Sequence, residues 1–230
     1  HLTASEIIDI TANDGDTFER VVSRECNIRT VGLRDETCPD QVRAEAGSLG
    51  AMYENEAAQR LYGLGVAVQD LGVLPGRKTL VLLSGGLMSS NRSGGRPSIS
   101  GFMGRLGEQA ARSNVTTYVL HVDDTFLETF SSAIGPSANP TDRFRTLMGD
   151  EAAFASGLER LAAEASGAFF SIKAGSGDLA FGRILRETMA YYLLGVEPTP
   201  EDWDGRKLLV KVKSRAKGTT VRALKEVIAR

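Results

Sequence analysis

A short apolar run between two turn signals constrains the fold more than any other stretch of this sequence. Residues 79–83 are five consecutive strand-favouring or aliphatic residues, preceded by Pro75-Gly76 and ended by Ser84-Gly85-Gly86. An unbroken run of this length is typical of a strand buried on both faces, and such strands occur mainly in parallel α/β sheets. The run therefore predicts the central strand of a Rossmann-like parallel sheet.

Helical and strand patterns alternate after this run. Helices are predicted at 102–113, 152–166 and 178–188, and further strands at 115–122 and 168–172, with Gly167 as a helix C-terminal glycine. Strand, helix and strand in this order indicate a parallel pair joined by a crossover helix. Residues 88–101, rich in Ser, Gly, Asn and Arg, predict a mobile surface loop at the C-terminal end of the central strand, and residues 123–150 a long connection.

The N-terminal part predicts helices. Thr3 and Glu6 have the spacing of a capping box, and a second helix is expected over 17–26. Apolar residues recur every three or four positions over 40–71, which predicts one long helix or two helices joined near 47–50.

Cys26 and Cys38 flank a polar loop between these helices. A disulfide would close a loop of about a dozen residues and contribute about 3 kcal/mol on the chain-entropy model. Two free buried thiols are the alternative, and a C-x11-C spacing without further ligands is a poor zinc signature.

The C-terminal part changes character. Residues 189–196 and 207–212 favour strands, residues 219–222 a third, and residues 221–230 a helical end. We therefore expect an α/β domain over 1–197, with a helical, disulfide-loop insertion at 1–40, and a C-terminal antiparallel β extension over 198–230.

Composition excludes two classes of partner. The formal net charge of −2 provides no basic face for nucleic acid. No run reaches the roughly 18 apolar residues of a membrane span. The first residue is His1, from which we expect a processed or excised piece, and a leader could have been lost with the missing part.

Five stretches carry a family resemblance in their order and spacing. They are PGRKTLVLLSGGL (75–87), SNVTTYVLHVD (113–123), LERLAAEASGAFF (158–170), RILRETMAYYLLGVEPT (183–199) and DGRKLLVKVKSRAKGTTVRA (204–223). This ordered set resembles the later part of the bacterial von Willebrand factor A-related (vWA) domain proteins, an extracytoplasmic group. The resemblance implies a secreted or periplasmic, non-catalytic adhesion module that binds a protein partner through loops at the strand ends.

The resemblance also implies a site that this chain holds only in part. The family binds Mg²⁺ through an Asp-x-Ser-x-Ser segment, which is absent here, and Ser84-Gly85-Gly86 stands where many A domains have Asp-Gly. Strands preceding this part in a full A domain would cover one edge of the sheet, and without them the chain would be prone to self-association. The expected partner-binding residues are Ser84, Gly85, Gly86, Asn91, Arg92, Arg96, Asp123 and Asp124.

A polar cluster at the end of the strand over 115–122 is a candidate metal site. His121, Asp123, Asp124 and Glu128 gather there, with Ser84 as a further oxygen, and a divalent cation such as Mg²⁺ would suit the carboxylates. The structural alternative is that these aspartates only cap a turn.

A glycine pattern favours a different function. The segment 175–180, which includes Gly175 and Gly177, fits the G-x-G-x-x-A variant of the dinucleotide fingerprint, and Glu197 lies where a carboxylate could bind a ribose. Such a fingerprint normally belongs to the first strand of its domain, whereas here it follows the last predicted parallel strand. A nucleotide- or dinucleotide-binding enzyme is therefore the alternative to the interaction module.

Overall fold

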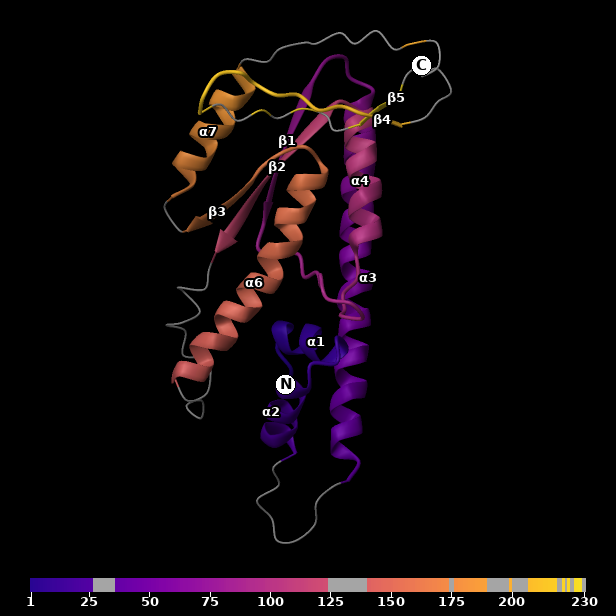
Figure 1. Cartoon of the computed structure of the whole chain (residues 1–230), viewed down its shortest axis with the longest axis vertical. Helices are drawn as coiled ribbons and strands as arrows, with labels where there is room; N and C mark the ends of the chain where they lie inside the picture. Colours follow the sequence, from indigo (N-terminus) through magenta and orange to yellow (C-terminus); the bar gives the residue numbers. More distant parts are fainter. Residues whose placement is uncertain are drawn as a thin grey trace.

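The chain is an α/β protein built on a parallel sheet. The computed structural model describes residues 1–26, 36–123, 140–173, 176–189, 199, 207–218, 221, 223 and 226–228. Its elements are α1 (Ala4–Thr11), α2 (Gly15–Glu25), α3 (Cys38–Gly72), β1 (Lys78–Ser84), α4 (Ser100–Arg112), β2 (Val115–Asp123), α6 (Pro140–Glu164), β3 (Phe169–Lys173), α7 (Gly177–Met189), β4 (Lys207–Leu209) and β5 (Glu226–Ile228). Figure 1 shows helices on both faces of the three-stranded sheet.

The strand order corrects one prediction. The sheet runs β1-β2-β3 with both pairs parallel, so β2 is central and β1 lies at the edge of the described sheet. β2 is buried along most of its length, whereas β1 alternates, with Val81 38% and Leu83 61% exposed. Because successive side chains of a strand point to opposite faces, only one face of β1 is covered.

The main core lies on the face of the sheet covered by α3, α4 and α6. Its buried side chains come from these helices and from strand residues such as Val115 and Val119, with Leu80 and Leu82 of β1 packed against them. The helix α7 covers the other face through Ala180 and Ile184, which pack on Tyr118 and Leu120 of β2. Both crossover helices, α4 and α6, therefore lie on one face, as two crossovers of the same hand require.

The N-terminal helices pack against the half of α3 that extends away from the sheet (Figure 1). The predicted capping box at Thr3 and Glu6 is confirmed, and Glu6 also accepts two hydrogen bonds from Arg24. The long helical pattern forms one 35-residue helix rather than two. The disulfide Cys26–Cys38 is present and ties the end of α2 to the start of α3.

The start and end of α6 differ from the sequence prediction. The helix begins at Pro140, a residue that the first helical turn tolerates. This early start shortens the connection predicted over 123–150. After the helix, the residue in the left-handed region is Ser166 (φ 55°), and the Gly167 amide donates to the carbonyl of Ala162. Gly167 is needed for another reason, since an added Cβ would lie 1.7 Å from the carbonyl oxygen of Thr117.

The C-terminal part is described only in pieces. β4 pairs antiparallel with β5. The helical end predicted over 221–230 is wrong at 226–228, where β5 forms instead. Most of the strand predicted over 189–196 and most of that over 219–222 lie outside the described residues, and Met189 belongs to α7. Within the described ranges, none of the helices combines the length and apolarity that a bilayer crossing needs.

Candidate functional site

The connection between β1 and α4, residues 85–99, is here called the site loop. The sequence predicts a surface loop of almost no apolar content over 88–101, but Met88 and Ile99 are buried there, as is Leu87 just before that range. The Leu87 amide donates to the carbonyl of Phe154 on α6 at 3.1 Å. The loop is therefore anchored at both ends, because these apolar side chains join the cores beneath it.

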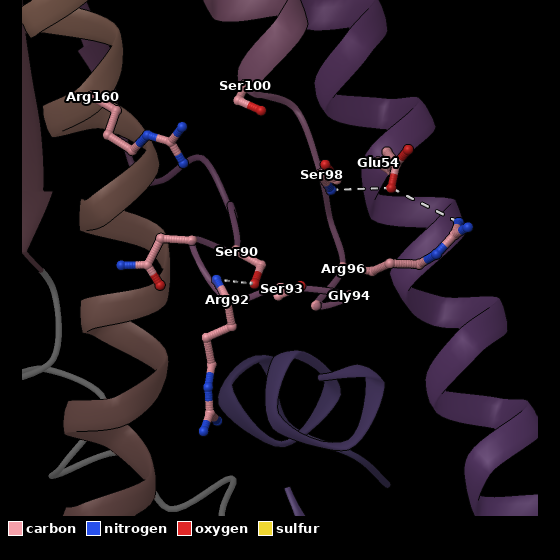
Figure 2. Close-up of a pocket in the computed structure, with 11 residues that line it drawn as sticks. Glu54, Ser90, Arg92, Ser93, Gly94, Arg96, Ser98, Ser100 and Arg160 are labelled. Atoms are coloured by element: carbon pink, nitrogen blue, oxygen red, sulfur yellow. Dashed lines mark hydrogen bonds and ion pairs between the residues drawn. The ribbon is translucent and has the colours of Figure 1, made fainter. Parts of the chain in front are cut away.

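The site loop, α3, the start of α4 and α6 line an open pocket of about 570 Å³. The residues that line it are Glu54, Ser90, Asn91, Arg92, Ser93, Gly94, Gly95, Arg96, Ser98, Ser100 and Arg160 (Figure 2). The pocket lies beyond the C-terminal end of β1, the side on which open α/β sheets bind their ligands. Three of the residues expected to bind a partner, Asn91, Arg92 and Arg96, are among the lining residues.

Arg92 fastens the loop to the N-terminal helices. Its guanidinium points away from the pocket in Figure 2 and pairs with the carboxylates of Asp9 and Asp14. Asp14 also caps α2, where its carboxylate accepts from the Thr17 amide. The Thr17 amide and the Arg92 guanidinium both lower the pKa of Asp14. Arg92 therefore has a structural role that its position in the sequence does not reveal.

We expect Asp14→Asn to reduce the acid sensitivity of this attachment. A lowered pKa means that the ionised carboxyl stabilises the fold above its usual titration range, near about pH 4, and that this contribution is lost as the pH falls through the lowered value. The melting temperature of the wild type should exceed that of Asp14→Asn at pH 7, and the two should converge as the pH falls through the lowered pKa. Asp16→Asn, which removes a carboxylate from the same turn, is the control. A gap for Asp14→Asn that persists at low pH would contradict this account.

Arg96 and Glu54 attach the other arm of the loop to α3. Glu54 accepts a hydrogen bond from the Ser98 amide at 3.0 Å and faces the Arg96 guanidinium at 3.8 Å. The Arg96 amide donates to the Thr11 hydroxyl of α1 at 2.8 Å. The charge of Arg96 is thus partly neutralised by a carboxylate on the pocket wall.

Arg160 enters the pocket from α6 and was not found from the sequence. Its Nη1 lies 3.5 Å from the Ser89 hydroxyl, and within the described residues its guanidinium forms no ion pair. The signal that could have found it is helical spacing, because Ala153, Gly157 and Arg160 follow one stripe of α6 toward the loop.

His121 joins the ends of two strands to α6. The ring is fully buried, with Nδ1 3.3 Å from the carbonyl oxygen of Ser84 and Nε2 2.5 Å from the Glu151 carboxylate. A carbonyl only accepts, so the tautomer that satisfies the Ser84 contact carries its proton on Nδ1, and Nε2 faces the Glu151 carboxylate. Both ring nitrogens are occupied by protein groups, and Glu151 was not predicted.

Of the other acidic residues of the predicted metal cluster, the structure describes only Asp123. Asp123 is half-buried at the end of β2, and Asp124 and Glu128 lie outside the described residues. In the ranges that the structure describes, His, Cys, Asp and Glu side chains do not gather in threes that could hold a metal ion.

The turn after β1 is held by the side chain of Ser84. The Ser84 hydroxyl accepts from the Gly86 amide at 3.2 Å. Gly86 has φ +156°, and an added Cβ would lie 2.7 Å from Cβ of Phe154, whereas Gly85 has open space around it. Ser84 and Gly86 thus set the direction in which the site loop leaves the strand.

The glycine pattern of the dinucleotide alternative cannot be assembled from the described residues. Gly177 is the first residue of α7. Gly175 and Glu197, which would complete the pattern, both lie outside the described ranges.

Comparison with known proteins returns no match to a protein-family model, a curated protein or a solved structure. What the chain does is therefore inferred from its own residues and their geometry.

Proposed function

We propose that this chain is the later part of a vWA-related domain and acts as a non-catalytic interaction module. Its partner is a protein, which it binds outside the cytoplasm through the site loop. The observation that carries this proposal is the pocket of about 570 Å³ that the loop forms with α3 and α6 at the strand ends. Pockets of this size accept a few side chains of a partner or a small ligand.

Four features support the finer parts of this proposal. The parallel sheet flanked by helices is the scaffold that a vWA domain needs. A disulfide suits an oxidising compartment. β1 lies at the edge of the described sheet, where further strands of the same domain would pair, and Val81 and Leu83 are exposed on a face that a helix of those missing units would cover. The antiparallel pair β4-β5 would belong to a C-terminal β extension.

Selection from a displayed peptide library tests this function even though the partner is unidentified. The immobilised chain should enrich a family of related peptides. Binding of these peptides should be lost in Ser93→Trp, which places a bulky side chain in the pocket wall, and kept in Gln59→Trp, which places the same side chain on an exposed position of α3 outside the lining.

Both variants should retain the melting temperature of the wild type, because Ser93 and Gln59 are exposed. The proposal fails if no peptide is enriched over the bare support, or if the enriched peptides bind Ser93→Trp as well as the wild type.

A further inference from the structure

The charges around the pocket are unevenly matched. Arg92 and Arg96 line it, but each faces a carboxylate of α1, α2 or α3. Arg160 is the lining arginine that no carboxylate of the described residues approaches, and it is only half-exposed. A partly desolvated guanidinium without a counter-charge is an attractive partner for an anion, because its planar donors match an oxyanion in a bidentate contact.

The start of α4, which directly follows the site loop, adds donors of the same kind. The helix α4 begins at Ser100 after Ile99, which cannot cap it with a side chain. Within the described residues, the amides of Ser100 and Gly101 have no acceptor, whereas those of Phe102 and Met103 donate to the Ile99 carbonyl. Ser100 of α4 and Arg160 of α6 both line the pocket (Figure 2), so the start of α4 is available to supplement the arginine.

The charge count indicates which anion fits. Three arginines line the pocket, and three carboxylates, those of Asp9, Asp14 and Glu54, pair with two of them. The formal charges of these six groups cancel, so a dianion would meet no net positive charge, and Arg160 is the one lining arginine that no carboxylate of the described residues pairs with. A carboxylate carries one charge and presents two oxygens to that guanidinium, whereas phosphate near neutral pH carries more charge than a single unpaired guanidinium matches.

We infer that the pocket recognises a carboxylate, with Arg160 as its principal ligand and the α4 amides as secondary donors. The inference rests on the proposed function and specifies it, since the carboxylate is then an Asp or Glu side chain of the partner protein. A free small carboxylate offers the same chemistry, so the test must separate the two sources.

The test is a titration of the ¹⁵N-labelled chain followed by NMR. The probe is acetyl-Gly-Glu-Gly-amide, and its matched control is acetyl-Gly-Gln-Gly-amide, which lacks only the charge. The Glu peptide should give saturable shifts at Arg160 Nε and at the amides of Ser100 and Gly101. We expect the affinity to fall about 10-fold or more in Arg160→Gln, since a charged hydrogen bond is lost, and to be unchanged in Arg105→Gln, an exposed arginine of α4 outside the lining.

Sodium acetate and inorganic phosphate complete the experiment. Weaker saturation by acetate than by the Glu peptide supports a side chain of a protein partner as the source. Equal shifts with the Gln peptide, tighter binding of phosphate, or an unchanged affinity in Arg160→Gln would overturn the inference. If the selected peptides bind but contain no fixed acidic residue, the carboxylate inference fails while the interaction function stands. If the pocket binds the carboxylate probes but no peptide is enriched, the carboxylate site stands and the interaction function fails.

Discussion

Gly157→Ala is expected to destabilise the fold by about 3 kcal/mol or more, because it forces a methyl group into a backbone contact. A Cβ at this position would lie 1.9 Å from the carbonyl oxygen of Leu87 and 3.2 Å from Cβ of Ser89. Neither neighbour can move easily, since both residues are buried and the Leu87 amide is bonded to Phe154. The higher helix propensity of alanine returns at most about 1 kcal/mol.

Gly104→Ala supplies the matched control. Gly104 also lies within a helix, α4, but an added Cβ would meet nothing within 4 Å. This variant should therefore be about 0.5 to 1 kcal/mol more stable than the wild type. Urea unfolding followed by far-UV circular dichroism measures both values. Equal stabilities of Gly157→Ala and Gly104→Ala would show that α6 and the loop do not approach each other this closely.

Gly157→Ala should also weaken ligand binding. Gly157 is less than one turn from Arg160 on α6, so a displaced helix moves the guanidinium relative to the loop. Gly50 of α3 makes a similar approach from the other side, where an added Cβ would lie 2.8 Å from Cβ of Arg96. The site loop is thus held between two helices at positions where only glycine fits.

The order of the elements could be predicted from the sequence, but the place of each strand could not. The helical periods and the apolar runs identify β1, β2, β3 and most helices, because these signals are local. The runs over 79–83 and 115–122 are both strand-like, and the second contains threonines and a histidine that look less buried. β2 is nevertheless central, because helices of both faces cover it, and that cover depends on segments far away in the chain.

The candidate site shows the same limit. A loop rich in Ser, Gly, Asn and Arg was predicted at the end of β1, and Asn91, Arg92 and Arg96 do line the pocket. The sequence could not tell that distant carboxylates neutralise two of these arginines, or that Arg160 of α6 brings the unmatched charge. Charge pairing across elements has no short-range pattern, so it becomes visible only in three dimensions.

The second large effect is expected at His121, whose replacement by alanine should cost about 3 to 5 kcal/mol. The variant removes a fully buried ring that stacks on Phe169, with centroids 6.0 Å apart. It also leaves the Glu151 carboxylate and the Ser84 carbonyl without their shared partner. Glu151→Gln should cost only about 1 kcal/mol, since an amide can still donate to Nε2 when Nδ1 carries the ring proton.

A double-mutant cycle separates the pair from the packing around it. His121→Ala and Glu151→Ala should each destabilise the chain. The double variant should cost less than the sum of the two by about 1 to 3 kcal/mol, because each single change leaves the other group without its hydrogen-bond partner. Additive costs would mean that the contact at Nε2 contributes nothing of its own. Glu151→Gln should still bind the Glu peptide, since Arg160 and the α4 amides remain. His121→Ala should bind it less well. It loses the imidazole ring that links the carbonyl of Ser84, where the turn into the site loop begins, to Glu151 of α6.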